Sequence, residues 1–332
     1  MKAVVLQAIN QPLIYTEIPT PTPQKNEVLL AIKAAALNHR DVYISQGLYP
    51  HIQCPVILGS DAVGQVVAVG ENVDNQLISK KFIINPNHNW GENEAVQSDM
   101  YHVLGMPTNG TLAEYICVNQ DRLLAAPAHL SDEEAAALPL AGLTAYRAVF
   151  TKGELKTGQK VLITGVGGGV ALLAMQLAMA AGAEIYVTSG DDDKLKKAIQ
   201  MGAMAGANYK NPDYYKTLLE QAKSGFDLII DSAGGGGFGR LIDMAKAGGR
   251  IVFYGGTQGA MKISPQKVFW KQLTICGSTM GTDAEFADMV AFVCQHKIRP
   301  IVDKIFNFSE ANQAFEYMHA AQQLGKIVLK KE

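Results

Sequence analysis

The chain has few of the features that mark secreted or zinc-binding proteins. Its 332 residues include only four cysteines, which are Cys54, Cys117, Cys276 and Cys294, and their spacing contains no C-x-x-C pair. This spacing predicts neither a disulfide framework nor a cysteine-bound zinc ion. We therefore expect buried or half-buried thiols in a reducing cytosol.

The sequence also lacks charge blocks and long apolar runs. The 29 basic and 31 acidic residues give a net charge of -2, so we expect no nucleic-acid partner. No apolar run reaches membrane-spanning length, and the start "MKAVVLQAIN" does not resemble a secretory signal. These patterns predict a cytoplasmic protein without membrane contact. A chain of this length predicts about two domains.

Glycine, in contrast, is abundant, with 32 residues that cluster at the ends of predicted strands. The first third holds short β-branched and aromatic runs separated by Pro, Gly and Asn, which predicts a β-rich region. After about Leu130, strands and helices alternate, as in "FDLIIDSAG" before "GRLIDMAKAGG", which predicts βαβ units in a parallel sheet. Ser131 and Glu134 form a capping-box pattern that predicts a helix start. The tail reads helix, strand, helix, strand, and we assign it to the first domain.

A glycine-rich turn separates a buried strand from an apolar helix in "VLITGVGGGVALLAMQLA". A helix N-terminus offers unpaired N–H groups and a positive dipole, and glycine lets a pyrophosphate approach the backbone. The match to G-x-G-x-x-G/A is partial, because Gly165 and Gly167 lead to Val170, and the register that ends at Ala171 begins at Val166. We interpret the turn as a dinucleotide site. The alternative is a turn packed only for tightness.

The end of the second strand of this region bears on the choice of cofactor. NAD sites usually place an Asp or Glu there to bind the ribose 2′-hydroxyl, whereas this chain has Ser189 and Gly190. The three aspartates of "DDDK" favour the N-terminus of the next helix instead. Lys194 is a candidate for binding a 2′-phosphate, with an ordinary solvated lysine as the alternative.

Six further blocks occur along the chain, in the order "LNHRDVYISQGLYP", "LGSDAVGQVVAVG", "NGTLAEYICV", "LPLAGLTAYRAV", "DLIIDSAGG" and "GKIVLK". Together they resemble the medium-chain dehydrogenase/reductase superfamily, specifically its zinc-free quinone oxidoreductase branch and proteins named zinc-type alcohol dehydrogenase-like. The resemblance implies an α/β fold. Residues 1–125 and 281–332 would form a GroES-like β-rich catalytic domain. Residues 126–280 would form a Rossmann NADP(H)-binding domain with a doubly wound parallel sheet.

The resemblance also bears on metal binding. The zinc branch of this superfamily holds catalytic zinc with Cys, His and Cys, where this chain has Asn38, Ser60 and Leu140. Catalytic zinc needs about three His, Cys or carboxylate ligands, which this set does not supply. The lobe that would hold a structural zinc has no Cys. Its His88 and His102 are either surface histidines or the ligands of a metal between them. We predict no zinc.

The quinone oxidoreductase branch assigns four catalytic candidates in the stretch from residue 36 to 50: Asn38, Asp41, Tyr43 and Tyr49. Either tyrosine could donate a proton or hydrogen bond, or form a pocket wall. Asn38 would position the nicotinamide ribose, and Asp41 would orient its neighbours. We expect His39 and Arg40 to be structural or surface groups. The cofactor candidates are Gly167, Gly168, Gly169, Val170, Ser189, Lys194, Tyr209, Gly255 and Thr144, with Lys194 and Tyr209 near the 2′-phosphate of NADPH.

Weak hydrogen-bond donors suit acceptors that spread negative charge, whereas simple aldehydes benefit more from a Lewis acid. The first hypothesis is therefore NADPH-dependent reduction of quinones or α,β-unsaturated carbonyls without zinc. An alcohol or aldehyde dehydrogenase of the same fold and a non-catalytic NADPH-binding protein are the alternatives. The stretch "KQLTICGSTMGT" predicts an edge strand that members of the family pair across a two-fold axis, so we expect a homodimer. The physiological substrate and the reaction direction stay open.

Overall fold

The computed structural model describes residues 1–331, which form two compact units. Residues Met1–Ala141 and the segment from Thr282 onward make the first unit, and Gly142–Gly281 make the second. The first unit therefore takes both ends of the chain, and the second is the continuous middle. The functional domain boundaries expected after residues 125 and 280 stay a prediction.

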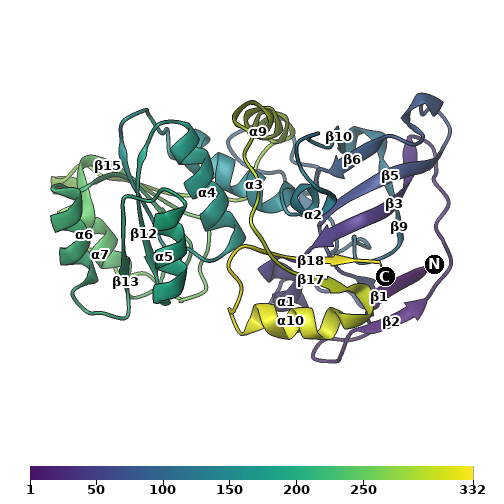
Figure 1. The fold of residues 1–332 in the computed structure, drawn as a ribbon, viewed down its shortest axis with the longest axis horizontal. Coiled ribbons are helices and arrows are strands. Elements are labelled where there is room, and N and C mark those ends of the chain that lie inside the picture. Colours follow the sequence, from purple (N-terminus) through teal and green to yellow (C-terminus); the bar gives the residue numbers. More distant parts are fainter. Residues whose placement is uncertain (332) are drawn as a thin grey trace. The chain divides into compact units, whose positions relative to one another are not determined.

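Antiparallel strands dominate the first unit (Figure 1). The strands are β1 (Lys2–Leu6), β2 (Ile14–Glu17), β3 (Glu27–Ala36), β4 (Val56–Ile57), β5 (Asp61–Val69), β6 (Lys81–Ile84), β7 (Asn87–His88), β8 (His102–Val103), β9 (Tyr115–Asn119), β10 (Leu123–Ala125), β17 (Val302–Asn307) and β18 (Lys326–Lys330). The largest sheet has the order β10-β6-β5-β3-β18-β17, and β9 also pairs with β3. Smaller sheets have the orders β2-β1-β4 and β7-β8. Because β18 pairs with β3, the two ends of the chain complete one sheet.

Short helices cover or connect these sheets. They are α1 (His39–Ser45), α2 (Asp132–Ala136), α9 (Asp283–His296) and α10 (Ala311–His319), with 3-10 turns η1 (Asn75–Leu77), η2 (Gln120–Arg122) and η4 (Phe308–Glu310). Helix α3 (Pro139–Tyr146) begins in the first unit and ends in the second. The predicted capping box of Ser131 and Glu134 is confirmed at the start of α2. The helix does not continue unbroken, because Pro139 lacks an N–H and instead starts α3. A π-helical turn, η3 (Arg147–Thr151), follows α3.

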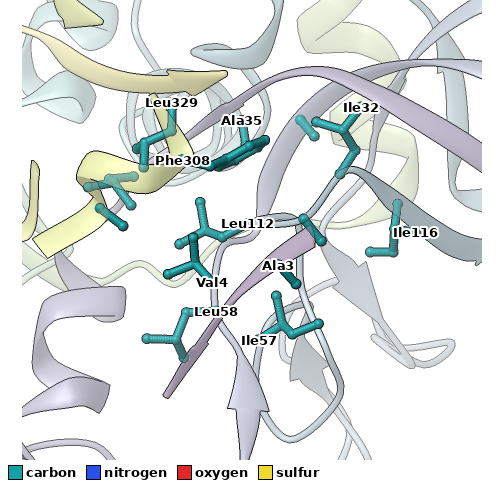
Figure 2. Packing of buried hydrophobic residues seen from close by; sticks show 14 of the residues in the cluster. Ala3, Val4, Ile32, Ala35, Ile57, Leu58, Leu112, Ile116, Phe308 and Leu329 are labelled. Carbon is teal, nitrogen blue, oxygen red and sulfur yellow. The ribbon is translucent and has the colours of Figure 1, made fainter. Parts of the chain in front are cut away.

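The core of the first unit mixes residues from both ends of the chain. Figure 2 shows Val4 and Leu112 packed in the same cluster as Phe308 and Leu329. Each of these four side chains is at most 1% exposed. Helix α10, drawn in yellow in Figure 1, packs against α1 and β18 of this unit. The C-terminal segment buries apolar surface in this core, and this burial holds α10 beside α1.

The second unit is built on one parallel sheet. Its strands are β11 (Lys160–Ile163), β12 (Glu184–Ser189), β13 (Ala205–Asn208), β14 (Phe226–Asp231), β15 (Ala245–Phe253) and β16 (Thr274–Gly277), and its helices are α4 (Gly169–Ala180), α5 (Asp192–Gln200), α6 (Tyr214–Ala222), α7 (Phe238–Met244) and α8 (Pro265–Trp270). The strand order is β13-β12-β11-β14-β15-β16, so the chain reverses direction across the sheet at β11. With the right-handed crossovers that parallel strands favour, this order puts helices on both faces of the sheet. The predicted α/β class with a doubly wound parallel sheet is confirmed.

Several details differ from the sequence-based expectations. The helix expected over "GRLIDMAKAGG" ends at Met244, and the following residues already belong to β15, because Gly248 and Gly249 disfavour helix. All four cysteines are free, but Cys54 is exposed rather than buried because it lies in the loop before β4. Among the helices of residues 1–331, none is long and apolar enough to cross a membrane.

Candidate active site

The polar stretch from residue 36 to 50 leaves β3 and continues as helix α1. The backbone N–H of Asn38 donates to Oδ2 of Asp41 at 2.8 Å, and the backbone N–H of Gly59 donates to Oδ1 of Asp41 at 3.2 Å. Asp41 is fully buried; burial raises the pKa of its carboxyl group, and the nearby charge of Arg40 acts in the opposite direction. Asp41 therefore ties the start of α1 to the loop before β5.

Three buried polar residues meet beside the start of α1. Lys326 Nζ donates to Asn38 Oδ1 at 2.6 Å and to Asp61 Oδ2 at 2.9 Å. Asn38 Nδ2 also donates to Asp61 Oδ2 at 2.9 Å. The exposed fractions are 8% for Asn38, 0% for Asp61 and 3% for Lys326. We call these three residues the Asn38 network.

Strand register explains why residues so distant in the sequence meet. Ala36 of β3 lies opposite Asp61 of β5 and also opposite Val328 of β18. Because β18 is antiparallel to β3, the positions two residues beyond Ala36 and two residues before Val328 face each other. These positions are Asn38 and Lys326. Sequence reasoning missed Lys326 and Asp61, although a charged residue at the start of the apolar strand "KIVLK" was an available signal.

None of the three side chains at the expected zinc-ligand positions is a usual zinc ligand, and the two polar ones accept hydrogen bonds from protein cations. Asn38 accepts from the Lys326 ammonium group, Ser60 Oγ accepts from Arg40 Nη1 at 2.6 Å, and Leu140 offers only an apolar side chain. Within residues 1–331, no group of three or more His, Cys, Asp or Glu side chains is arranged to hold a metal ion. An amide and a hydroxyl beside two protein cations do not fit a catalytic zinc ion.

The two candidate tyrosines have different surroundings. Tyr43 lies in α1, half-buried, with its ring centroid 6.3 Å from that of the exposed His39. Burial raises the pKa of Tyr43, which makes its hydroxyl group a weaker acid than an exposed phenol. The Arg40 guanidinium lies 5.2 Å from the ring centroid of Tyr49, within cation–π range. Arg40 also donates to the carbonyl of Leu104 at 2.7 Å, so it links α1 to the chain around β8.

The glycine-rich turn of the second unit lies between β11 and α4. Gly168 is the N-cap of α4, and Gly169 and Val170 are its first residues. Gly165 has a φ of 68° and Gly167 a φ of 144°, conformations that L side chains rarely adopt. Apart from its own chain neighbours, nothing in residues 1–331 lies within 4 Å of the place a Cβ on Gly168 would take. The first N–H groups of a 12-residue helix are thus accessible at an open backbone, which fits a pyrophosphate.

Lys194 and Tyr209 lie close to the end of β12. A Cβ on Gly167 would lie 3.6 Å from Lys194 Nζ, and one on Gly190 would lie 2.6 Å from the Tyr209 hydroxyl oxygen. Ser189, the last residue of β12, is 4% exposed. The carboxylate of Asp191 instead accepts the N–H groups of Asp193 and Lys194, at 2.8 and 3.2 Å, and caps α5. This confirms that the aspartates serve the helix N-terminus.

The remaining cofactor candidates lie in two places. Gly255 follows β15, where a Cβ would collide with the carbonyl of Ser232, and a Cβ on Gly165 would lie 2.5 Å from Ser232 Oγ. Gly165, Ser232 and Gly255 thus gather at the carboxyl ends of β11, β14 and β15, the edge where ligands bind doubly wound sheets. Thr144 belongs to α3, where its hydroxyl donates to Met280 Sδ at 3.5 Å.

His88 and His102 form a stacked pair on the β7-β8 hairpin. Their ring centroids are 4.9 Å apart with an interplanar angle of 7°. Burial lowers the pKa of His88 to about 4, helped by His102 and Arg122, and its Nε2 atom is buried without a hydrogen-bond partner. A cationic neighbour and the lack of a third metal-binding side chain in residues 1–331 do not favour a metal ion here.

Comparison with known proteins identifies the family. Residues 24–128 match the family model described as alcohol dehydrogenase GroES-like domain, and residues 169–295 match the zinc-binding dehydrogenase model. The chain is 36% identical to the zinc-type alcohol dehydrogenase-like protein YogA of Leptosphaeria maculans, over 96% of this chain and 94% of that protein. It belongs to the medium-chain dehydrogenase/reductase superfamily, which consists of pyridine-nucleotide-dependent oxidoreductases. The expected GroES-like and Rossmann folds are thereby confirmed.

Other relatives have different named activities. Acryloyl-coenzyme A reductase of Sulfurisphaera tokodaii is 28% identical over 99% of this chain and all of that protein. Quinone oxidoreductase of Mus musculus is 26% identical over 95% of this chain and 92% of that protein. A crystal structure of an NAD-dependent alcohol dehydrogenase superposes with a TM-score of 0.94 at 34% identity, and both chains are fully covered. The chain is thus an oxidoreductase of this superfamily.

We predict that His88 makes folding sensitive to acid. Its pKa of about 4 in the folded protein lies below the ordinary 6.5, so the unfolded chain binds the proton first as the pH falls. Stability should decrease from pH 6.5 to pH 4 by about 1–2 kcal/mol after allowance for solvent screening. Urea unfolding at pH 7 and pH 4.5 should show that His88→Asn loses less stability than wild type. Equal losses would contradict this prediction.

Proposed function

We propose that this chain is an NADPH-dependent oxidoreductase of the zinc-free quinone oxidoreductase branch, which reduces quinones or α,β-unsaturated carbonyls. The observation that carries the proposal is the Asn38 network. In it, the Asn38 amide is bound by the ammonium group of Lys326 and the carboxylate of Asp61, not by a set of metal ligands. A cytoplasmic location, expected from the sequence, is part of the same proposal.

The second unit supplies the support for NADPH. Ser189 and Gly190 stand where an NAD site usually has a carboxylate, and Asp191 is occupied in capping α5. The Lys194 ammonium group and the Tyr209 hydroxyl group lie near this strand end, where a 2′-phosphate would gain charge-assisted hydrogen bonds. Gly167, Gly168, Gly169 and Val170 would hold the pyrophosphate. When bound, NADPH supplies a hydride for the reduction.

The first unit supplies hydrogen-bond donors for the acceptor. Negative charge develops on the carbonyl oxygen when the conjugated acceptor is reduced, and donors aimed at this oxygen stabilise it. Tyr43 is the first candidate to donate a hydrogen bond or a proton to this oxygen; because burial raises its pKa, the hydrogen bond is the easier of the two roles. Tyr49, under the Arg40 guanidinium, is the second candidate. Asn38 offers an amide N–H, and Asp41 orients the start of α1.

The names of two relatives are consistent with this class of acceptor. A quinone and an acryloyl thioester both carry a carbonyl group conjugated to a carbon–carbon double bond, so the developing charge is delocalised. Weak donors are sufficient for such acceptors, whereas an unconjugated aldehyde benefits more from a Lewis acid. An alcohol or aldehyde dehydrogenase and a non-catalytic NADPH-binding protein are the alternatives that the test must separate.

We expect the purified protein to oxidise NADPH in the presence of benzoquinones or enones, at a rate that prolonged treatment with a zinc chelator leaves unchanged. The rate would be followed at the NADPH absorbance band, with metal content measured on the same sample. Stoichiometric zinc whose removal abolishes activity would favour the alcohol dehydrogenase alternative. Tight NADPH binding without turnover across a broad acceptor panel would favour the non-catalytic one.

We expect Lys194→Ala to raise the KM for NADPH by about 10- to 100-fold and to change the KM for NADH by less than about 3-fold. The reason is that Lys194 would make a charge-assisted contact only with the 2′-phosphate. Lys196→Ala is the matched control, because Lys196 is on the same helix, 72% exposed, and pairs with Asp193. If Lys194→Ala raised both KM values equally, Lys194 would not select the phosphate.

We also propose that the protein is a homodimer that pairs through β16. This strand lies at one edge of the six-stranded sheet, and Phe269 and Trp270 of the preceding α8 are 64% and 84% exposed. An unpaired edge beside exposed aromatic rings favours association with a second copy. Sedimentation at micromolar concentration should give about twice the chain mass of 35.7 kDa. A species of single-chain mass would contradict the homodimer.

A further inference from the structure

Lys326 lies outside every set of residues assigned above to substrate or cofactor, yet it is one of the most buried cations of the first unit. Its side chain is 4% exposed, and it contacts the catalytic candidate Asn38 directly. Burying an ammonium group is costly unless it is paired and hydrogen-bonded. Here the carboxylate of Asp61, itself fully buried, supplies the charge partner at 2.9 Å.

The ammonium group determines how the Asn38 amide is oriented. A lysine ammonium is a donor only, so the amide oxygen rather than the amide nitrogen must face it. The opposite end of the amide then donates one hydrogen to Asp61 at 2.9 Å. Rotating the amide by 180° would place its NH2 group against the ammonium and its oxygen against a carboxylate, which loses both hydrogen bonds.

This arrangement leaves one amide hydrogen of Asn38 uncommitted. The Nδ2 atom carries two hydrogens, and the hydrogen bonds of residues 1–331 use one of them, for Asp61. At the start of α1, the Asp41 carboxylate accepts the Asn38 backbone N–H at 2.8 Å as part of a capping box, which uses neither hydrogen of Nδ2. Lys326 and Asp61 thus hold the two ends of the Asn38 amide.

We propose that Lys326 is a positioning residue of the reduction site: its ammonium group fixes the Asn38 amide so that the second Nδ2 hydrogen is presented to the ligand. This inference rests on the proposed function. Asn38 stands at the position where the zinc branch of the family has a metal ligand. In this chain the charge of Lys326 orients the Asn38 side chain. Lys326 does not contact the acceptor, and its effect on turnover passes entirely through Asn38.

The test is a double-mutant cycle on kcat between Lys326 and Asn38. We expect Asn38→Ala and Lys326→Met each to lower kcat by about 10- to 100-fold, the range for a displaced or removed donor. In the Asn38→Ala background, Lys326→Met should lower kcat by less than about 2-fold, because the group it positions is gone. Lys326→Arg keeps the charge and a donor and should recover kcat to within about 5-fold of wild type.

Two controls separate positioning from stability. Lys326→Met leaves Asp61 as a buried unpaired carboxylate and is expected to weaken folding. The variant Lys326→Met/Asp61→Asn removes both charges. The amide oxygen introduced at position 61 can still accept the backbone N–H of Leu140, which Asp61 accepts at 2.8 Å. This variant should fold and should bind NADPH with a dissociation constant within about 3-fold of wild type, measured by fluorescence. Its kcat should still be about 10- to 100-fold lower than that of wild type.

A spectroscopic measurement gives a readout that does not depend on turnover. In protein labelled with ¹⁵N-asparagine, the side-chain NH2 resonances of Asn38 are identified by their loss in Asn38→Ala. They should shift in Lys326→Met/Asp61→Asn and return towards the wild-type position in Lys326→Arg. Three results would each overturn the inference. The resonances could be unchanged in Lys326→Met/Asp61→Asn, or this variant could fail to fold. Lys326→Met could also lower kcat by the same factor with and without the Asn38 side chain. Wild-type protein that reduces no acceptor would overturn the proposed function alone, since the resonances still report on Lys326.

Discussion

The buried ion pair between Asp61 and Lys326 is the interaction on which the candidate active site depends. It joins the first residue of β5 to the first residue of β18, and both residues hold the side chain of Asn38. Breaking one half of such a pair strands a charge in the interior, so the three residues act as a unit. The pair forms where the C-terminal strand β18 pairs with β3, so it joins segments from both ends of the chain.

The same pair changes what chemistry the first unit can perform. A site with an open metal position polarises its substrate with a divalent cation. Here the positive charges are those of Lys326 and Arg40, which are already committed to Asp61, Asn38 and Ser60. The groups left for a substrate are weaker donors, such as phenols and an amide N–H. For the proposed function, conjugated acceptors, which delocalise charge, would suit these donors better than unconjugated aldehydes would.

Local patterns predicted much of the fold. The alternation of strands and helices predicted the parallel sheet, and the sequence from Ser131 to Glu134 predicted the start of α2, because both depend on neighbours in the chain. The extent of α7 could not be predicted in this way, because the pairing of β15 with β14 competes with helix for the residues after Met244. Motifs also gave Asn38, Ser189 and Lys194 as candidate site residues, and their roles stay a prediction. The partner of Asn38 could not be found from motifs, because Lys326 reaches Asn38 through sheet register between segments 288 residues apart.

The central claim is that protein cations, not a metal ion, bind the side chains of Asn38 and Ser60: Lys326 binds Asn38, and Arg40 binds Ser60. The most direct measurement is X-ray diffraction at the zinc absorption edge from crystals soaked in a zinc salt. The account predicts no anomalous peak beside these two residues and a Lys326 side chain that still contacts Asn38. A strong peak between Asn38 and Ser60, with Lys326 displaced from Asp61, would contradict it.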